Sequence, residues 1–477
     1  MLTIKEMKVL EKNSEQYGIT EDILMENAGR GIAEILLTKF KVEKKKVLIA
    51  AGYGNNGGDG FVAARYLQKK GVDVSIWLVG SPENIKTSVA KMNFNKIDKT
   101  ISVHWDIPMD DLNKVDLVVD ALLGAGLRGN LSEQYRYAVD TINRSDAEVV
   151  AVDVPTGFGT DLFVNADATI TMHDIKEGMN THNCGTIYIV DIGIPHDAML
   201  YTGMGDMLLY PVPKKEAKKG DNGKVAVIGG GPYTGAVYFA LMGALKIGAD
   251  LAYAIVPESI NDVMAAYSPD IITIKYNGEH LNKEVISIYS PSDYNAIVMG
   301  MGIGRGGEIE RTFCELIKKT DRPMVIDADG LHAIKKHLSI LNGKKAVLTP
   351  HRGEFEMLTD IKLDNDLDNK IIQVKKFAEK IDQVVVLKGV IDIVTDGRSV
   401  KLNRTGNSRM SVGGTGDLLS GIIGGLIGKG MDLYNAAVLG TYINGFAGDI
   451  AFNKKRWSMT TSDVIDELSN VFITHNV

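Results

Sequence analysis

The sequence predicts an α/β protein with two domains, each built on a mainly parallel β-sheet. Short β-branched runs alternate with helical patterns from Lys46 onward, and the same alternation restarts at Lys224. Between the two series lies YPVPKKEAKKGDNG, rich in proline and lysine and without an apolar period. A length of 477 residues agrees with more than one core. We expect domains at residues 1–210 and 224–477, joined by a linker at 211–223.

The first half contains short apolar runs that are expected to be strands of a buried parallel sheet. The expected strands are residues 47–50, 72–79, 115–120 and 148–155. Helical patterns follow them at residues 61–69, up to residue 94, and at 133–142. Residues 168–172 and 186–193 also look like strands but lack long helices between them, so the sheet should finish there.

The second half repeats this pattern and then ends in helices. Its expected strands are residues 224–231, 252–257, 295–304, 323–330, 345–354 and 383–389. Residues 391–400 read as a hairpin with Asp396 and Gly397 in its turn. A helix is expected from Gly235, and the chain should be helical from Asp417 to its end.

Composition and charge favour a soluble cytoplasmic protein that acts on small molecules. The net charge of −7 gives no basic field for nucleic acid or an anionic membrane. The uncharged run from Leu418 to Gly428 is too short to span a bilayer. Cys184 and Cys314 lack metal-type spacing and are expected to be free thiols. We expect neither nucleic acid nor a membrane as a partner, and we expect the protein to form a homo-oligomer.

The stretch AGYGNNGGDG, residues 51–60, matches the G-x-G-x-x-G pattern of a dinucleotide clamp. Alone, the pattern also fits an ordinary turn between a strand and a helix. Asn55, Asn56 and Asp59 are not needed by a pyrophosphate clamp. They therefore indicate that this loop does more than hold a redox cofactor.

Further polar residues follow other strands of the first half. Asp120 ends one strand, and Asp153 and Thr156 follow the next. Ligands of open parallel sheets bind at the carboxyl ends of the strands. Asn56, Asp120 and Thr156 supply oxygen ligands suited to an alkali or alkaline-earth cation. A second glycine-rich loop, LLGAGLRGN, carries Arg128, which either pairs with phosphate or lies in an exposed loop.

The second half contains SVGGTGDLLSGIIGGLIG, residues 411–428, and the sequence has no P-loop motif. Gly413, Gly414 and Gly416 form a turn before a helix whose first residue is expected to be Asp417. Backbone amides at such a helix end can bind phosphate, and Asp417 can accept the proton of an attacking hydroxyl. The alternative is that Asp417 only caps the helix.

GYGNNGGDGFVAARYL, DALLGAGLRG, VAVDVPTGFGTD and ADATITMHDIKEGM closely resemble the NAD(P)H-hydrate epimerase family over residues 1–210. The resemblance implies a Rossmann-like three-layer domain that interconverts R- and S-NAD(P)HX, whose nicotinamide ring carries a hydroxyl at C6. It implies K⁺ at Asn56, Asp120 and Thr156, and acid–base work by Asp153 with Lys176 beside it. Thr156 and Ala125 depart from the commoner Ser and Thr. The implied substrate-binding residues are Asn55, Asn56, Gly57, Gly58, Asp59, Gly124, Ala125, Gly126, Leu127, Arg128, Gly129, Asn130 and Asp153.

GKVAVIGGGPYTGA, MGMGIG, VIDADGL, LTPHRGEF and VVLKG, together with the GGTGD loop, strongly resemble the NAD(P)H-hydrate dehydratase family from Gly220 onward. The resemblance implies a ribokinase-like α/β domain that phosphorylates the hydrate with ADP or ATP and Mg²⁺, after which phosphate leaves. Lys218 stands where His is common. Glu354 either arranges Mg²⁺ or is solvated, and His351 either contacts substrate or is a satisfied loop histidine. The implied hydrate-binding residues are Ala240, Gly302, His351 and Asp417, and the implied nucleotide-binding residues are Lys388, Gly389, Val390, Ile391, Asp392 and Gly416.

These resemblances predict a fused repair enzyme that restores NAD(P)H, with ADP favoured over ATP as its co-substrate. Two alternatives belong to other classes. The first is a small-metabolite kinase of the ribokinase-like class with a non-catalytic N-terminal binding module. The second uses the N-terminal fold as a scaffold, for example for RNA. The combination of GNNGGDG with LTPHRGEF disfavours the kinase, and the acidic balance disfavours the scaffold.

Overall fold

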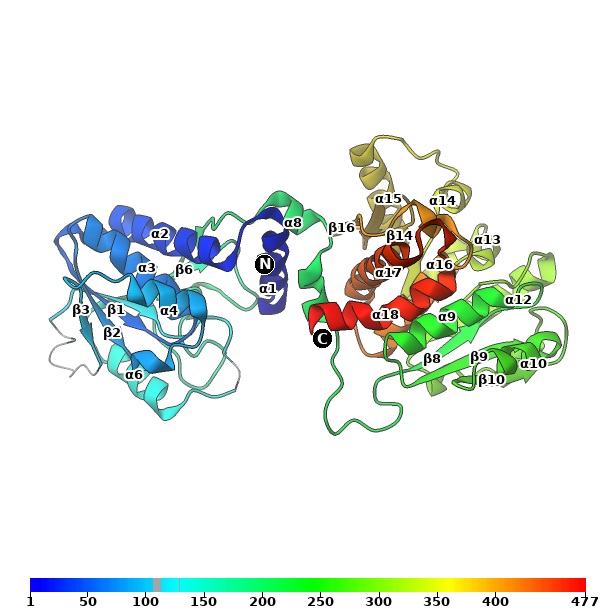
Figure 1. The fold of residues 1–477 in the computed structure, drawn as a ribbon, viewed down its shortest axis with the longest axis horizontal. Coiled ribbons are helices and arrows are strands. Elements are labelled where there is room, and N and C mark those ends of the chain that lie inside the picture. Colours follow the sequence, from blue (N-terminus) through cyan, green and yellow to red (C-terminus); the bar gives the residue numbers. More distant parts are fainter. Residues whose placement is uncertain (106–111, 113, 128) are drawn as a thin grey trace. The chain divides into compact units, whose positions relative to one another are not determined.

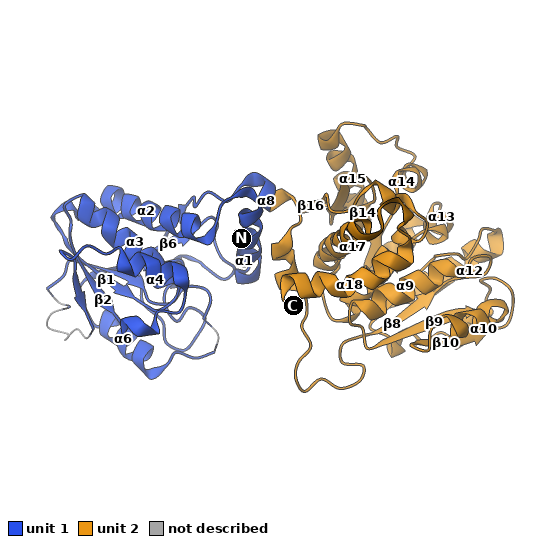
Figure 2. Ribbon diagram, in the orientation of Figure 1, with its two compact units in different colours: residues 1–198 blue, residues 199–477 orange. Residues whose placement is uncertain are grey.

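The computed structural model describes residues 1–105, 112, 114–127 and 129–477. The chain divides into two compact units, Met1–Ala198 and Met199–Val477 (Figure 2). The division falls before residue 210 because the segment after Ala198 already packs on the second unit. Tyr201 forms a bridge with Leu402, and the Thr202 amide donates to the Leu402 carbonyl at 2.8 Å.

The first unit contains a seven-stranded sheet in the order β3-β2-β1-β4-β5-β6-β7, with every pairing parallel among the described residues. Its strands are β1 (Lys46–Ala51), β2 (Asp73–Leu78), β3 (Ser102–His104), β4 (Leu117–Ala121), β5 (Glu148–Val152), β6 (Ala168–Met172) and β7 (Thr186–Val190). The expected end of the sheet is confirmed, because β6 and β7 form one edge. The expected strand at residues 115–120 corresponds to β4, which ends one residue later.

Helices cover both faces of this sheet, which confirms a three-layer, Rossmann-like arrangement (Figure 1). The helices of this unit are α1 (Ile4–Ser14), α2 (Glu21–Phe40), α3 (Asn55–Lys69), α4 (Ser88–Asn95), α6 (Glu133–Asn143) and α7 (Thr181–Cys184), and the boundary between the two units falls within α8 (His196–Leu200). Helix α3 packs on the face that carries Ile49, and α6 packs on the face that carries Leu48 and Ala50. The side chains of β1 alternate between the two cores because a strand points successive residues to opposite faces.

The second unit contains a nine-stranded sheet in the order β10-β9-β8-β11-β12-β13-β14-β15-β16. Its strands are β8 (Lys224–Ile228), β9 (Leu251–Pro257), β10 (Ile271–Tyr276), β11 (Ala296–Met299), β12 (Met324–Ile326), β13 (Ala346–Leu348), β14 (Val384–Leu387), β15 (Asp392–Thr395) and β16 (Val400–Asn403). The first seven strands in this order are parallel. Strands β15 and β16 form the predicted antiparallel hairpin, with Gly397 at φ 87° in its turn.

Two layers of helices enclose the second sheet (Figure 1). One core contains α9 (Gly235–Lys246), α10 (Glu258–Tyr267), α16 (Thr415–Gly428), α17 (Leu433–Lys455) and α18 (Thr461–His475). The other contains α11 (Glu284–Ile288), α12 (Gly307–Lys319), α13 (Asp329–Ile334), α14 (Arg352–Thr359) and α15 (Leu367–Ile381). The uncharged run of residues 418–428 lies within α16, buried in the first of these cores. Across the described chain, no helix is both long and apolar enough to cross a membrane.

Helix α16 begins at Thr415, so the expectation that Asp417 is its first residue is wrong. The residue before the helix is Gly414, at φ 102°, and no side chain caps this helix end. Asp417 lies in the first turn with its carboxyl group free of the capping role. This geometry excludes the interpretation that Asp417 only caps the helix.

Candidate active sites

The first unit contains an open cleft of about 800 Å³ at the carboxyl ends of β1, β4 and β5. It is large enough for a substantial part of a dinucleotide. Ten of the residues singled out from the sequence line it, namely Asn55, Asn56, Asp59, Gly124, Ala125, Gly126, Leu127, Asn130, Asp153 and Lys176. Gly57, Gly58 and Gly129 are absent from its lining, and Arg128 lies outside the described residues.

The glycines of the first loop allow close contacts between backbone segments. A Cβ on Gly52 would lie 1.9 Å from the Leu122 carbonyl oxygen, and one on Gly57 would lie 2.1 Å from the Gly52 carbonyl oxygen. Gly54, which precedes α3, has open space and lines the cleft. The G-x-G-x-x-G pattern therefore closes the loop against the end of β4 and directs the first turn of α3 at the cleft.

Asp153 and Lys176 form an ion pair at the base of the cleft. Asp153 follows β5 with φ 68°, a conformation that non-glycine residues adopt rarely and that recurs at functional sites. Its Oδ1 lies 2.9 Å from Lys176 Nζ, and its Oδ2 accepts from the Ala125 amide at 2.8 Å. The ammonium group of Lys176 also donates to Thr171 Oγ1 at 2.8 Å and to the Met172 carbonyl at 2.7 Å. Lys176 is buried and its three donors are used, so it fixes the position of Asp153.

Asp120 and Thr156 form a second buried polar contact beside the cleft. The Thr156 hydroxyl donates to Asp120 Oδ1 at 2.7 Å, and the Thr156 amide donates to Oδ2 at 2.7 Å. Burial raises the pKa of Asp120 to about 6, although these hydrogen bonds lower it. No cationic side chain of the described residues pairs with this carboxylate.

Asn56 is joined to the Asp120–Thr156 pair through consecutive amides of the second glycine-rich loop. The Leu123 amide donates to Thr156 Oγ1 at 2.9 Å. With the Asn56 amide oriented by its hydrogen bonds, its oxygen accepts from the Gly124 amide at 3.2 Å and its nitrogen donates to the Val152 carbonyl at 3.3 Å. The structure thus brings the three predicted cation ligands next to residues 123 and 124 of the second glycine-rich loop.

The sequence motifs missed one side of this cleft. Ile4, Met7, Lys8 and Glu11 line it from α1, at the spacing of one helix face. Tyr53, Asn84, Lys86, Ser132, Gln134 and Tyr135 also line it. The N-terminal segment MLTIKEMKVLEKNSEQ has helical apolar spacing, but nothing in its sequence indicates that this helix lies at the cleft.

The second unit contains a cleft of about 690 Å³ that gathers all six predicted nucleotide-binding residues. These are Lys388, Gly389, Val390, Ile391, Asp392 and Gly416. Asp392 Oδ1 accepts from the Gly389 amide at 2.9 Å, and Oδ2 accepts from Asn403 Nδ2 at 3.0 Å, so this carboxyl group shapes the turn. Residues 404–408 and the α17 residues Thr441, Asn444 and Gly445 complete the cleft, and sequence motifs did not indicate them.

Lys388 follows β14 and is a half-buried cation beside the start of α16. Its Nζ lies 2.8 Å from Asp327 Oδ1, and a Cβ on Gly416 would lie 3.2 Å from the same nitrogen. Ser420 donates to Asp327 Oδ2 at 2.7 Å and so holds the other oxygen. Burial alone would lower the pKa of Lys388, but the carboxylates of Asp327 and Glu354 outweigh it and raise the pKa.

Asp417 shares this environment and has a strongly perturbed carboxyl group. Burial raises the pKa of Asp417 to about 7, and the Asp327 carboxylate adds to the increase. Lys388 acts in the opposite direction. A carboxyl group with this pKa is deprotonated in part at neutral pH and can accept a proton there.

His351 and Glu354 form a capping box at the start of α14. The Glu354 amide donates to His351 Nδ1 at 3.2 Å, and the His351 amide donates to Glu354 Oε2 at 2.8 Å. Glu354 is only 7% exposed, so the alternative that it is solvated is wrong. The His351 side chain is 60% exposed, its Nε2 lies 3.5 Å from Glu354 Oε1, and its Nδ1 has a structural role.

The other two predicted hydrate-site residues lie in different surroundings. Gly302 follows β11 at φ 67°, where a Cβ would lie 2.7 Å from the Tyr233 carbonyl oxygen. Ala240 is buried within α9, against Gly421 of α16. The structure brings Gly302 to the loop edge of the sheet and leaves Ala240 in a helix contact.

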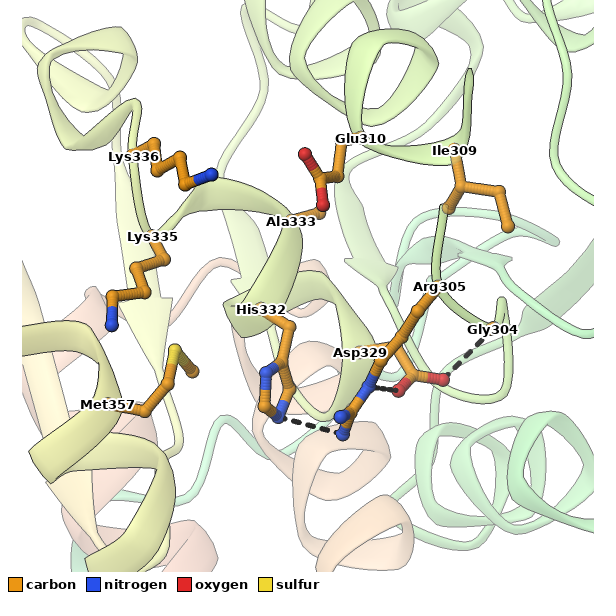
Figure 3. Close-up of a pocket in the computed structure, with 10 residues that line it drawn as sticks. All are labelled: Gly304, Arg305, Ile309, Glu310, Asp329, His332, Ala333, Lys335, Lys336 and Met357. Atoms are coloured by element: carbon orange, nitrogen blue, oxygen red, sulfur yellow. Dashed lines mark hydrogen bonds and ion pairs between the residues drawn. The ribbon is translucent and has the colours of Figure 1, made fainter. Parts of the chain in front are cut away.

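A small cavity of about 180 Å³ lies beside Gly302, between the loop after β11 and α13 (Figure 3). Arg305 extends across it, with Nε 3.4 Å from Asp329 Oδ1 and Nη2 3.0 Å from His332 Nε2. Asp329 Oδ2 also accepts from the Gly304 amide at 3.0 Å. Asp329 contributes to the raised pKa of Asp417, and His351 contributes to the lowered pKa of His332, whose main cause is burial.

The two folds and their clefts define a protein with two α/β ligand-binding units. A family model described as NAD(P)H-hydrate dehydratase matches residues 225–470, and one described as YjeF-related protein N-terminus matches residues 21–178. A ribokinase-like superfamily protein from Enterococcus faecalis, 19% identical, aligns with a TM-score of 0.50 over 59% of this chain and 98% of its own. This likeness shows that the second unit has the ribokinase-like fold.

Full-length relatives define the family more narrowly. The chain is 38% identical over 482 residues to a bifunctional NAD(P)H-hydrate repair enzyme from Archaeoglobus fulgidus, covering 99% of this chain and 98% of that one. It is 32% identical over 511 residues to the enzyme of that name from Moorella thermoacetica, covering 99% and 96%. The chain belongs to the family of bifunctional NAD(P)H-hydrate repair enzymes.

Proposed function

We propose that this protein repairs hydrated nicotinamide cofactors by two reactions in separate units. The first unit interconverts R- and S-NAD(P)HX, and the second dehydrates S-NAD(P)HX to NAD(P)H at the expense of a nucleotide. The observation that carries the proposal is that each unit holds a carboxylate beside a lysine at the loop edge of its sheet. These are Asp153 with Lys176, and Asp417 with Lys388.

In the first unit, the hydrate lies in the cleft between the two glycine-rich loops. Epimerising C6 requires proton movement at its hydroxyl group, and Asp153 supplies or removes that proton. Lys176 keeps Asp153 in place through the 2.9 Å ion pair. Asn55, Asn56, Asp59 and residues 124–130 hold the remainder of the ligand, so that the hydrated nicotinamide is bound as substrate.

The Asp120 environment fits a potassium ion. Its carboxylate is buried without a cationic partner among the described residues, and the side-chain oxygens of Thr156 and Asn56 contact the adjacent amides of Leu123 and Gly124. A bound monovalent cation would supply the missing positive charge. Asn56, Asp120 and Thr156 would hold it and would thereby fix the Leu123–Gly124 backbone against the substrate.

In the second unit, the C6 hydroxyl of S-NAD(P)HX attacks the terminal phosphoryl group of the nucleotide. Asp417 accepts the hydroxyl proton. Lys388 and the first amides of α16 stabilise the charge on the transferring group. Phosphate then leaves from C6, because it is a better leaving group than hydroxide, and loss of a proton from C5 restores the ring C5=C6 double bond.

The nucleotide occupies the cleft between residues 388–392 and Gly416. In the described residues, no three His, Cys, Asp or Glu side chains are grouped to hold a metal ion. Mg²⁺ would therefore be bound mainly by the nucleotide phosphates, with few protein ligands. We propose ADP as the co-substrate, giving AMP and phosphate. The domain limits at 210 and 224, the homo-oligomer and the cytoplasmic location remain predictions.

The test is to incubate the whole chain with a mixture of R- and S-NADPHX and either ADP or ATP, with Mg²⁺ and K⁺. Absorbance at the NADPH band should rise until both epimers are consumed, and faster with ADP. Replacing K⁺ with choline should slow consumption of the R form alone. The alternative of a small-metabolite kinase predicts nucleotide hydrolysis or transfer without recovery of NADPH from either epimer.

A further inference from the structure

Helix α1 forms one wall of the epimerase cleft and lies outside the part of the chain matched by the family model, which begins at residue 21. Its start is fixed next to Lys176. The Leu2 amide donates to the Ile175 carbonyl at 3.0 Å, and the Glu177 amide donates to the Leu2 carbonyl at 2.9 Å. A capping box of Thr3 and Glu6 then begins the helix. The position of α1 over the cleft is therefore coupled to the strand end that carries the Asp153–Lys176 pair.

The cleft-facing side of α1 presents Glu11 to the ion pair. Ile4, Met7, Lys8 and Glu11 share one face at the i, i+3, i+4 and i+7 spacing, and all four line the cleft. Lys8 Nζ lies 4.0 Å from where a Cβ on Gly126 would be, so this helix face reaches the second glycine-rich loop. Glu11 is exposed to solvent and lines the cleft.

We propose that Glu11 is the second proton-transferring residue of the epimerase cleft and acts on the opposite side of the hydrate from Asp153. The inference rests on the proposed epimerase function. Inverting C6 by loss and return of water needs a proton donor on one face of the ring and an acceptor on the other. Asp153 follows a strand at the base of the cleft, whereas Glu11 projects from the helix that covers it.

The step balances with water as its only co-reactant. On one face, the protonated carboxyl group gives its proton to the C6 hydroxyl, the C–O bond breaks and water leaves. The ring nitrogen supplies the electron pair that stabilises C6. Water then adds to the other face and loses a proton to the carboxylate there. One proton enters and one is removed, and the two carboxyl groups exchange roles in the reverse direction.

The charges around Glu11 suit a group that must give and accept protons. Protein enclosure and the Asp153 carboxylate raise the pKa of Glu11 to about 7, while Lys176 and Lys8 oppose this and Glu21 adds to it. Both protonation states are then present near neutral pH. Burial and the Asp153 and Glu11 carboxylates also raise the pKa of Asp59 well above its usual range.

The test compares Glu11→Gln with Glu15→Gln in the full chain. Glu15 lies just after the same helix and forms an exposed ion pair with Lys12 at 2.7 Å. R-to-S exchange of NADPHX is followed by NMR, and dehydration of S-NADPHX by the same preparation verifies folding. We expect Glu11→Gln to lower kcat for exchange by about 100-fold with little change in KM. Glu11→Asp should recover part of the rate, and Glu15→Gln should retain it.

The pH profile separates proton transfer from a structural role. Exchange by the wild-type chain should slow as pH rises through about 7, where Glu11 loses its proton. Glu11→Gln should lack this alkaline limb. Two results would overturn the inference. The first is a Glu11→Gln variant with the wild-type kcat and an unchanged alkaline limb of the pH profile. The second is loss of the alkaline limb in Asp59→Asn rather than in Glu11→Gln. Failure of the wild-type chain to exchange the epimers would instead overturn the epimerase function itself.

Discussion

At the scale of single residues, both units place one lysine among three carboxyl groups. The first set is Lys176 with Asp153, Glu11 and Asp59, and the second is Lys388 with Asp327, Glu354 and Asp417. Repulsion among the carboxylates and restricted solvation raise the pKa of Glu11 and that of Asp417 to about 7, so each of these groups is partly protonated near neutral pH. Such perturbed groups are costly for folding and useful for proton transfer. The two sites therefore share one arrangement of charges, a lysine among several carboxyl groups, although the two units have different folds.

Asp417→Asn should make the second unit more stable at pH 8 while abolishing dehydration. The folded-state pKa of about 7 exceeds the usual 3.8, so the wild-type free energy of unfolding falls as pH rises from about 4 to 7. The asparagine variant lacks this loss and should be more stable by at least about 1 kcal/mol at pH 8. Urea unfolding, followed in the transition that ADP shifts, measures the difference.

The difference between Asp417→Asn and wild type should shrink as the pH is lowered toward 4, because a protonated aspartate resembles asparagine in charge. Asp321→Asn is the matched control, since the Asp321 side chain is 75% exposed. It should show no such pH dependence. Equal or lower stability of Asp417→Asn at pH 8 would contradict the proposed electrostatic strain.

At the scale of elements, glycines bring α16 close to α9 and to the sheet. A Cβ on Gly421 would lie 1.9 Å from the Ala240 carbonyl oxygen, and one on Gly243 would lie 2.5 Å from the Leu418 carbonyl oxygen. A Cβ on Gly424 would lie 2.2 Å from a methyl of Val298 in β11. Helix α16 carries both Asp417 and the amides at its start. Close helix packing therefore sets the position of the turn that carries Asp417.

Gly421→Ala should displace α16 and weaken the second unit by about 1–3 kcal/mol, because the added methyl group meets backbone that cannot yield locally. Dehydration should slow, whereas R-to-S exchange in the first unit should continue at the wild-type rate. Thermal unfolding and both assays measure these effects. Gly307→Ala in α12 is the control, because the nearest atom would be Arg311 Nη1 at 3.6 Å. Equal stability of Gly421→Ala and wild type would show that the helix contact is not tight.

The sequence predicted the central elements well because buried parallel strands are short apolar runs with distinct boundaries. It missed β3 and β10 because these edge strands are partly exposed and lack a continuous apolar pattern. It placed the start of α16 two residues late because Gly416 suggested a turn, whereas Gly416 is helical and only Gly414 has a positive φ. Local glycine content does not specify which glycine leaves the helix.

Residues of the two clefts could be predicted where they belong to a sequence motif. They could not be predicted where only tertiary packing brings them to the cleft. Asp153, Asp417 and the residues 388–392 follow strands or begin helices at the predicted edge. Glu11 reaches the cleft only because the segment at Leu2 pairs with Lys176. The ion pair between Asp327 and Lys388 could not be predicted from the sequence. It forms because these residues follow β12 and β14, which lie on either side of β13 in the folded sheet.

At the scale of the whole molecule, each unit has its own sheet, cores and cleft. Because each proposed site is complete within its unit, the two activities should be separable. An equimolar mixture of Asp153→Ala and Asp417→Ala chains should restore NADPH from R-NADPHX with ADP, although neither variant does so efficiently alone. The intermediate epimer would pass through solution. No gain on mixing, with both single-site defects verified, would contradict the separability of the units.

The most direct measurement of the central claim uses purified single epimers with the Asp153→Ala and Asp417→Ala chains. We predict that Asp417→Ala exchanges R and S at the wild-type rate but restores no NADPH. Asp153→Ala should restore NADPH from the S form at the wild-type rate and from the R form about 100-fold more slowly, measured under conditions where uncatalysed exchange is subtracted. Wild-type restoration from the R form by Asp153→Ala, or from either form by Asp417→Ala, would contradict the account.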